Sequence, residues 1–448
     1  MTRAKTPRTG KLTRGAIAGL AAARIGLASL GHSVRPARTN AQAQAQEQAA
    51  HEAHIGQMLY RTMGQLRGTA LKVSQLLSMD ASFLPPGIRA ELARACHQVA
   101  PLNRALVGRV FRANFGREPQ DLFTTFEPVA FAAASLGQVH RAELAGHGVV
   151  AVKVQYPGIA ATITSDLVLL RAALKGLRYG AMPLPDNLVI DRVMDEVQQM
   201  LQREVDYLQE AQTLQWFGQN AAPPGVVIPQ PVMSHTTAQV LTLQHLQGLH
   251  LHDWLQTEPA QSERNRFGQL LFDWFMHCAF SLKHIHADFH PGNILFLQDG
   301  RLGILDFGCT RTLSPTFAKG VIATWSAWLA PPSPAQQQTL LQTYRALGLL
   351  KSDVDASIFA AQLLPALAPM LAWQMEPFTQ PIFNFSRKSV PPAPQTESQR
   401  VLARYMAGVP PEMPAFERAW LGLMHLLTRI GGHVNTTGHC SHSAMQDI

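Results

Sequence analysis

Two pairs of short apolar segments stand out in the pattern of hydrophobic and polar positions. In each pair, a turn joins the two segments. Residues 139–144 and 149–155 alternate or run apolar on either side of a glycine-containing turn. Residues 294–297 and 301–305 flank an Asp-Gly pair at 299–300, a dipeptide that favours a tight hairpin turn. The pattern therefore predicts two antiparallel hairpins, one on each side of a long intervening segment.

Other segments repeat apolar residues with the period of an α-helix. One stripe comprises Ile190, Met194, Val197, Leu201, Leu208 and Ala211. Glu204 lies in the middle of this stripe. A second helix is predicted over residues 58–78, where Lys72 and Gln75 are neighbours on a polar face. Hairpins separated by helical segments indicate an α+β fold.

The second hairpin belongs to the stretch HADFHPGNILFLQDGRLGILDFG, residues 286–308. A His-x-Asp, an Asn five residues after the Asp, a hairpin and then Asp-Phe-Gly form the catalytic half of a kinase-like phosphoryl-transfer site. In this arrangement Asp288 accepts or orients the proton of an attacking hydroxyl or water. Asn293 and Asp306 hold the metal ions that bridge the nucleotide phosphates.

The first hairpin carries the expected phosphate-contacting lysine. Lys153 lies in the strand sequence Val-Ala-Val-Lys, and a lysine in an apolar strand needs an anionic partner. Glu204 is the preferred candidate because it lies on an apolar helical stripe. Glu196 and Glu210 remain alternatives.

The loop before Lys153 has alanines where a protein kinase has a glycine-rich phosphate loop. It reads FAAASLGQVH at residues 131–140. Together with VVAVKVQYPG, the Glu204-x-Asp206 motif and HADFHPGN, it resembles the UbiB family of atypical kinase-like proteins, also called AarF or ADCK. The resemblance covers roughly residues 50–435. It implies that the nucleotide is bound by Lys153 and by the loop residues Ala132, Ala133, Ala134, Ser135 and Gly137.

The resemblance also implies a bilobal protein-kinase-like fold with an N-terminal helical extension, ATP or ADP and Mg²⁺ as cofactors, and ATPase or small-molecule kinase activity in ubiquinone or prenyl-lipid metabolism. The family's helical Lys-x-Gly-Gln motif folds over the nucleotide cleft and corresponds here to Lys72 and Gln75. Two residues depart from the family pattern: Ser74 replaces glycine, and Phe289 replaces proline. Because phenylalanine frees the backbone that proline fixes, the catalytic loop is either looser or anchored by an inward-packed Phe289.

Two further features bear on the substrate. Ala287 precedes Asp288, where many protein kinases have arginine, and no Ala-Pro-Glu follows Asp-Phe-Gly. We therefore expect a lipid or small-molecule substrate, or water. A nucleotide-gated lipid-binding or chaperone-like protein is the main alternative. An aminoglycoside-phosphotransferase-like kinase is a weaker one, because it shares the catalytic motif but lacks the alanine-rich loop.

The net charge of +8 lies entirely in the N-terminal segment. Eight basic residues precede the first acidic residue, Glu47, and the other 30 basic residues equal the 30 acidic ones. Residues 15–30 form an apolar run too short to span a bilayer. We expect peripheral association with the cytoplasmic face of a membrane, or else organelle targeting to a mitochondrion or plastid. We expect no nucleic-acid partner, and a lipid-biosynthesis complex is a further possible partner. No run of 18 or more apolar residues occurs in the sequence.

The predicted organisation has five parts. They are a basic tail (1–46), a helical extension (47–117), an N-lobe (118–243), a helical C-lobe (244–435) and a flexible tail (436–448). Prolines at 331–334 and 391–394 predict breaks within the C-lobe. Four scattered cysteines predict no disulfide framework.

Overall fold

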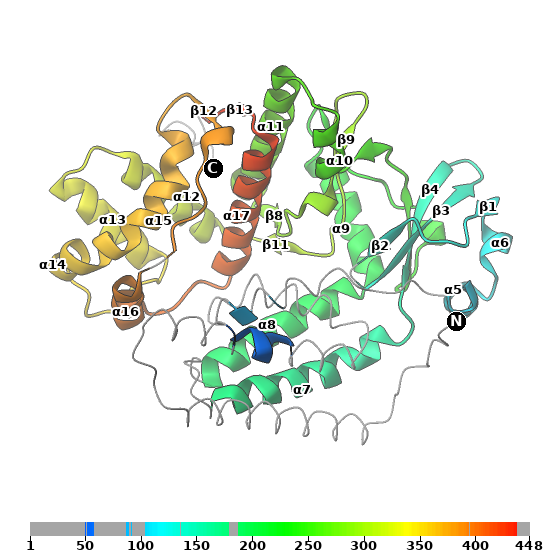
Figure 1. The fold of residues 1–448 in the computed structure, drawn as a ribbon, viewed down its shortest axis with the longest axis horizontal. Helices are drawn as coiled ribbons and strands as arrows, with labels where there is room; N and C mark the ends of the chain where they lie inside the picture. Colours follow the sequence, from blue (N-terminus) through cyan, green and yellow to red (C-terminus); the bar gives the residue numbers. More distant parts are fainter. Residues whose placement is uncertain are drawn as a thin grey trace. The chain divides into compact units, whose positions relative to one another are not determined.

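A computed structural model describes residues 104–134, 136–178, 187–393 and 395–436, with short helical pieces at 50, 52–57, 87–88 and 91. The chain divides into two compact units (Figure 1). The first contains residues 1–212 and 231–245, and the second contains residues 213–230 and 246–448. The expected boundary at 243 lies close to the break at 245. The pattern of the sequence did not indicate that residues 213–230 belong to the second unit.

The first unit is built on a five-stranded antiparallel sheet. Its main path runs β1-β3-β4-β6, and β2 pairs with β3. The strands are β1 (Thr125–Phe126), β2 (Ala132–Ala134), β3 (Gly137–Leu144), β4 (Gly148–Gln155) and β6 (Val240–Gln244). The hairpin predicted between residues 139 and 155 is confirmed as β3–β4. Its central strand, β4, is hydrogen-bonded on both edges, which fixes the position of any side chain it carries.

Helices α5 (Arg104–Phe115) and α6 (Pro119–Leu122) precede this sheet. Val107, Val110 and Phe111 of α5 are buried in one apolar cluster with β-branched residues of β4. Alternate residues of β4, Val150, Val152 and Val154, face this cluster. Lys153 therefore points to the opposite face of the sheet.

Two long antiparallel helices, α7 (Ile159–Arg178) and α8 (Asn187–Glu204), complete the first unit. The predicted apolar stripe of α8 is confirmed over its four positions from Ile190 to Leu201, which are all buried. The stripe does not continue past Glu204. The chain turns there, and a new helix, α9 (Tyr207–Asn220), begins. Leu208 is consequently exposed, contrary to its expected place on the stripe.

The second unit contains a small sheet in the order β5-β10-β9-β7. These strands are β5 (Val226–Val227), β10 (Leu302–Ile304), β9 (Ile294–Leu297) and β7 (Gly248–Leu249). The predicted second hairpin is confirmed as β9–β10, and Gly300 in its turn has a φ of +81°. Beside it, β8 (His284–His286) pairs with β11 (Thr310–Thr312). Strand β12 (Ile382–Asn384) pairs with β13 (His433–Asn435).

The rest of the second unit is helical (Figure 1). Its helices are α10 (Leu251–Gln256), α11 (Gln261–Met276), α12 (Pro315–Leu329), α13 (Pro334–Ala346), α14 (Ala356–Ile358), α15 (Leu364–Met375), α16 (Thr396–Tyr405) and α17 (Met413–Ile430). Phe275 of α11, Trp325 of α12 and Trp420 of α17 pack together in its core. The two predicted proline breaks separate α12 from α13 and precede α16.

One helical stretch among the described residues, 356–378, is long and apolar enough to cross a membrane by length and composition. It joins α14, a π-helical turn (Phe359–Leu363), α15 and a final 3-10 turn. Its mean hydropathy over an 18-residue window is 1.5. We expected no uninterrupted run of 18 apolar residues, and the sequence pattern did not single out this stretch, whose mean hydropathy is nevertheless high. Ser357, Gln362 and Gln374 interrupt the apolar run, but residues 356–375 carry no charge.

Candidate active site

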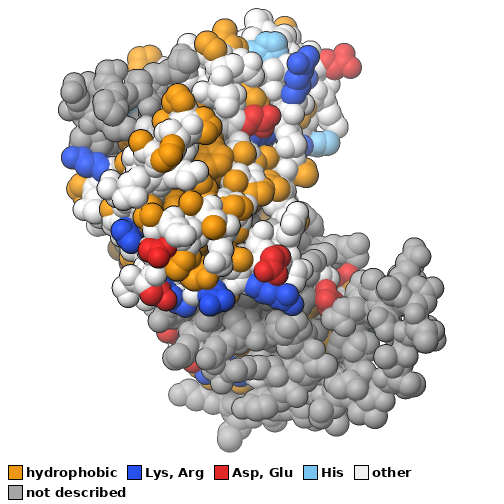
Figure 2. Space-filling model, turned by 90° about the vertical axis from the view of Figure 1, so that its left-hand side faces the viewer, with side chains coloured by type: hydrophobic (Ala, Val, Ile, Leu, Met, Phe, Trp, Pro, Cys, Tyr) orange, Lys and Arg blue, Asp and Glu red, His pale blue; other side chains and the backbone are white. Residues whose placement is uncertain are grey.

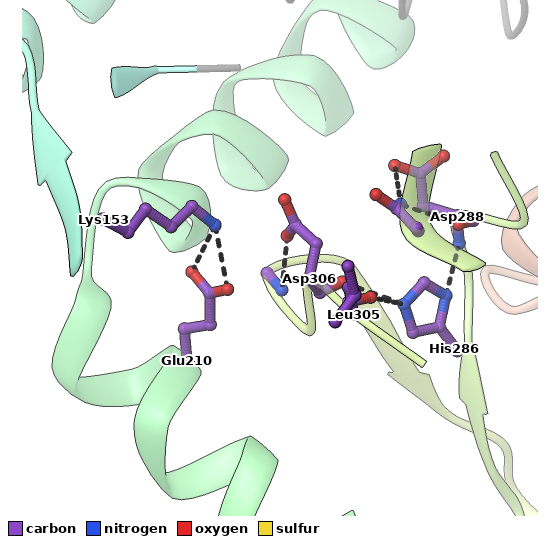
Figure 3. Close-up of polar contacts among 8 residues, drawn as sticks. Lys153, Glu210, His286, Asp288, Leu305 and Asp306 are labelled. Atoms are coloured by element: carbon purple, nitrogen blue, oxygen red, sulfur yellow. Dashed lines mark hydrogen bonds and ion pairs between the residues drawn. The ribbon is translucent and has the colours of Figure 1, made fainter. Parts of the chain in front are cut away.

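The lysine of β4 forms a buried ion pair in the first unit (Figure 3). Lys153 Nζ lies 2.9 Å and 3.0 Å from the two carboxylate oxygens of Glu210, in the first turn of α9. The side chains of Lys153 and Glu210 are 8% and 1% exposed. The ring of Tyr207 lies 5.2 Å from the same ammonium group. The anionic partner expected for a strand-borne lysine is therefore present, but its identity differs from the preferred candidate.

The preference for Glu204 as the partner of Lys153 is corrected, and the alternative Glu210 is the observed partner. The prediction assumed one continuous helix from residue 190 to 211. The helix is instead interrupted at Asp206. Its Oδ1 accepts hydrogen bonds from the backbone N–H groups of Leu208 and Gln209, so Asp206 caps the start of a new helix. Glu204 is buried at the last position of α8. An aspartate that precedes a polar first turn is a helix-start signal that could have revealed this break.

The alanine-rich segment forms strand β2 and returns directly into β3. Ala132, Ala133 and Ala134 pair with Val139, Gln138 and Gly137, respectively. A Cβ on Gly137 would lie 2.4 Å from the carbonyl oxygen of Val154, so this position requires glycine. Ser135 lies outside the described residues. The alanines are thus fixed in a sheet, and their methyl groups occupy space that glycines would leave open.

The catalytic loop of the second unit lies between β8 and β9 and is anchored by His286 (Figure 3). The His286 ring is buried, and its Nε2 donates to the carbonyl oxygens of Leu305 and Asp306 at 3.1 Å and 2.9 Å. Its Nδ1 accepts from the backbone N–H of Asp288 at 3.3 Å. Burial lowers the pKa of His286, which keeps the ring neutral and Nδ1 available as an acceptor. One histidine therefore joins the two segments that carry the expected carboxylates.

Asp288, Asn293 and Asp306 are brought together by the β9–β10 hairpin. Asn293 Nδ2 donates to Asp288 Oδ2 at 3.2 Å and to the Asp288 carbonyl at 3.1 Å. The backbone N–H of Leu305 donates to the Asn293 carbonyl at 2.8 Å, so the residue after Leu305 returns beside Asn293. Asp306 has a φ of +56°, an uncommon conformation for a residue with a side chain. The three predicted side chains thus converge in the second unit, within a framework of local hydrogen bonds.

Comparison with known proteins agrees with this geometry. A profile of the ABC1 atypical kinase-like domain matches residues 94–333. The chain belongs to this family, the UbiB/AarF family of atypical kinases. The match includes β4, α9, both hairpins and the catalytic loop.

Individual relatives point the same way. "Protein ACTIVITY OF BC1 COMPLEX KINASE 8, chloroplastic" of Arabidopsis thaliana is 31% identical over 60% of this chain and 36% of its own length. "Atypical kinase COQ8B, mitochondrial" of Rattus norvegicus is 30% identical over 68% of this chain and 58% of its own length. "Atypical kinase COQ8, mitochondrial" of Saccharomyces cerevisiae is 27% identical over 84% of this chain and 72% of its own length.

A solved structure shares the fold. It is the complex of Rv3197 with erythromycin from Mycobacterium tuberculosis, with a TM-score of 0.59 and 25% identity, covering 88% of this chain and 95% of that one. This chain spans less than half the length of the first curated relatives, between 36% and 48%. The family assignment therefore rests on the shared kinase-like domain.

Within the UbiB family framework, the second unit presents the donor types that Mg²⁺ prefers. Mg²⁺ takes few protein ligands and completes its octahedron with water and phosphate oxygens. Asn293 donates through Nδ2, which leaves its amide oxygen oriented as an acceptor, and Asp306 contributes a carboxylate. Among the described residues there is no group of three or more His, Cys, Asp or Glu that could hold a metal ion. The oxygen donors of Asn293 and Asp306 fit a Mg²⁺ ion that is also bound by phosphate oxygens and water.

Phe289, one of the two departures from the UbiB pattern, packs inward. It is 5% exposed, and its ring contacts those of Trp274, Phe275 and His286. Gly422 of α17 makes room for it, because a Cβ there would lie 2.8 Å from Phe289 Cβ. Of the two expectations for this loop, the anchored one is the observed arrangement.

Sequence reasoning missed Arg418, a residue of α17 that holds the catalytic loop. Its Nε donates to the Ala287 carbonyl at 2.8 Å, and its second guanidinium nitrogen lies 3.3 Å from Cys309 Sγ. Arg418 is 131 residues from Ala287 and 109 residues from Cys309 along the chain, so no local pattern indicated these contacts. Lys72, Gln75 and Ser74 lie outside the described residues.

Proposed function

We propose that this protein is a Mg²⁺-dependent ATPase or small-molecule kinase of the UbiB family. The observation that carries the proposal is the hydrogen-bonded set of Asp288 and Asn293, to which the β9–β10 hairpin returns Asp306. Phosphoryl transfer requires little covalent chemistry from the protein, and it depends on positioning and on neutralising charge. Carboxylate and amide groups fixed in this way suit that task.

Each residue of the second unit has a defined role in the proposal. Asp288 accepts the proton of the attacking hydroxyl or water, and its hydrogen bond to Asn293 Nδ2 orients the carboxylate. Asn293 and Asp306 would hold Mg²⁺, and the ion would supply positive charge next to the nucleotide phosphates. The neutral His286 ring holds the segments that carry Asp288 and Asp306 in place through its hydrogen bonds. It positions Asp288 and Asp306 and does not contact the reacting atoms.

In the first unit, Lys153 is assigned to the phosphate oxygens of the nucleotide. Its bidentate pairing with Glu210 holds the ammonium group and offsets the cost of burying it. The alanine methyl groups of β2 restrict how closely the backbone can approach a phosphate. This supports a nucleotide pose that differs from that of a glycine-loop kinase and a slower transfer to protein hydroxyls.

The proposed substrate is a lipid or another small molecule of ubiquinone or prenyl-lipid metabolism, with water as the alternative acceptor. Ala287 and the missing Ala-Pro-Glu motif support this, because both alter the usual platform for a protein substrate. Relatives named as mitochondrial and chloroplastic atypical kinases support an organellar compartment or, in a bacterium, the cytoplasmic face of the membrane. The basic N-terminal segment supports peripheral membrane association and, as a further partner, a lipid-biosynthesis complex.

The test uses the full-length protein with Mg²⁺, γ-labelled ATP, liposomes and a lipid extract. A labelled organic product identifies a kinase, and release of free phosphate alone identifies an ATPase. Asp288→Asn is expected to lower either rate by about 100-fold or more while nucleotide binding persists. Nucleotide binding with no turnover in wild-type protein would overturn the enzyme proposal. It would instead support a nucleotide-gated lipid-binding protein.

A further inference from the structure

The helical stretch 356–378 of the second unit is only partly buried. Only 22% of its most apolar 18-residue window is buried inside the protein, although residues 356–375 contain no Lys, Arg, Asp or Glu. A helix that is apolar all round normally lies in a protein core or in lipid. In Figure 1, α14 lies at the left-hand edge of the second unit, and α15 lies further inward, near α12.

The two sides of this stretch differ in packing, and neither carries a charge between residues 356 and 375. The inward side is buried and comprises Phe359, Leu363, Leu371, Trp373 and Met375. The exposed side carries Gln362 and four apolar residues, Ala361, Pro365, Pro369 and Ala372, which follow one another at helical steps of four, four and three. We call these four residues the outer helix face. Figure 2 shows hydrophobic side chains gathered on this side of the molecule.

Further exposed apolar residues continue this surface beyond α15. Trp373 Nε1 donates to the Ser389 carbonyl at 2.8 Å, which fixes the following loop against the C-terminal half of α15. Val390 in this loop is 84% exposed. Lys388 beside it is tied to Glu376 at 2.9 Å, so the loop is anchored on both sides of the tryptophan. The apolar surface is therefore a fixed feature of the unit.

The chain next to the outer helix face is basic. Arg387, Arg400 and Arg404 in this part of the chain are exposed. Lys388 is buried against Glu376 and does not contribute, and the one acidic residue of 379–410, Glu397, pairs with Arg400. Arg400 and Arg404 lie on α16, which packs against α15. An uncharged apolar surface bordered by net positive charge complements a bilayer that contains anionic lipid.

We propose that the outer helix face docks on a lipid bilayer, with the stretch 356–378 lying in the plane of the headgroup region. The inward side chains hold the helix to α12 and α16, so it lies on the membrane and does not span it. Alanine and proline offer none of the aromatic or arginine anchors typical of a protein interface, whereas lipid requires no matching shape. The inference deepens the membrane part of the proposed function and is independent of the N-terminal segment.

The experiment uses full-length protein and vesicles of phosphatidylcholine with a minor share of phosphatidylglycerol. High salt screens the contribution of the basic N-terminal segment. Ala361→Glu combined with Ala372→Glu is expected to weaken vesicle binding by roughly tenfold or more, because two carboxylates enter the apolar contact. The matched control, Gln256→Glu with Ser262→Glu, adds the same charge at exposed positions at the end of α10 and the start of α11 and is expected to bind like wild type.

Three readouts keep the outcomes distinct. Undiminished vesicle binding by the double variant overturns the proposal. A wild-type dimer that the variant dissociates in sedimentation velocity assigns the face to a second copy of the chain and also overturns it. Failure of wild-type protein to bind Mg-ATP, with the vesicle results as expected, refutes the nucleotide proposal alone.

A second pair of variants guards against a folding defect. If the double glutamate variant melts below wild type, Ala361→Gln and Ala372→Gln replace it, since glutamine is a good helix former and adds no charge. Each is then expected to weaken vesicle binding by about threefold, because a polar amide enters the apolar contact. Binding equal to wild type in both would overturn the proposal.

Discussion

At the scale of single residues, the site is organised by buried side chains that each satisfy more than one backbone or charged group. Lys153 is held by both oxygens of Glu210. His286 donates to two carbonyls and accepts from the Asp288 backbone. Such multiply bonded groups are costly to remove, because each deletion leaves several buried partners unsatisfied. The first two predictions follow from this.

Asp306→Asn is expected to abolish the thermal stabilisation by Mg-ATP, since it removes the charged oxygen that a hard cation prefers. Thermal-shift titration with Mg-ATP measures this effect. Asp299→Asn is the control, because Asp299 lies in the exposed hairpin turn and bonds to Arg301. A full shift in the Asp306 variant would remove this residue from the proposed metal site.

Lys153→Met and Glu210→Gln are each expected to cost roughly 1–3 kcal/mol of stability or nucleotide affinity. The double variant should cost less than the sum, because it leaves no unpaired buried charge. Urea unfolding and nucleotide titration of all four proteins test this. The same cycle with Glu204→Gln serves as the comparison and should show the smaller coupling. Additive effects for Lys153 and Glu210 would contradict the pairing.

At the scale of elements, strand β2 and the break between α8 and α9 have the largest effect on the surroundings of Lys153. Pairing with β3 gives the alanine segment a fixed register, so its methyl groups lie at defined positions. The break at Asp206 rotates Glu210 onto Lys153 and turns Leu208 toward solvent. A small local change in either element would therefore alter the surroundings of Lys153.

Ala133→Gly should change the relative affinity for ATP and ADP and leave the fold intact. Glycine frees the strand and costs about 0.5–1 kcal/mol of stability, well below what would unfold the unit. Isothermal titration with each nucleotide gives the ratio. Ala160→Gly, at an exposed position of α7, is a suitable control for the lost methyl group. An unchanged ratio would show that the alanines only fill space.

At the scale of the whole molecule, a histidine in each unit whose pKa is lowered in the folded protein links stability to pH. Burial lowers the pKa of His140 in the first unit and of His284 in the second. His140 donates through Nδ1 to the Glu127 carbonyl and accepts at Nε2 from Gln138, so protonation breaks one of these bonds. Both histidines bind a proton more readily when unfolded, where the pKa is 6.5.

Stability should therefore be complete above pH 6.5 and decline as the pH falls toward the lower folded pKa values. Urea midpoints measured between pH 7.5 and pH 5 test this window, which lies above the usual range of carboxylates. The His140→Phe variant has no group at this position that can take up a proton. Its urea midpoint at pH 7.5 should be lower than that of wild type, but it should fall by less between pH 7.5 and pH 5. A midpoint that does not change with pH would contradict the linkage.

The N-terminal segment gives a prediction for the whole chain. Deleting residues 1–40 removes all of the excess positive charge and should weaken binding to anionic vesicles at low salt, by up to about 1 kcal/mol per basic residue near the surface. Nucleotide binding should be unchanged. Binding that persists at high salt would be carried by the outer helix face. Undiminished binding at low salt would indicate that the segment is a targeting peptide.

The sequence alone determined the local parts of the site. The β3–β4 and β9–β10 hairpins, and the convergence of Asp288, Asn293 and Asp306 within 19 residues, follow from turn chemistry and short spacing. Such contacts need little more than a strand, a turn and a strand, so the pattern of side chains is sufficient to predict them.

Only the tertiary structure decided the contacts between distant segments. It paired Lys153 with Glu210, placed Arg418 on the catalytic loop, and packed Phe289 against the space left by Gly422. It also showed that the apolar stretch 356–378 is only partly buried. These outcomes depend on where helices end and which faces meet, and periodicity within one element carries no information about either.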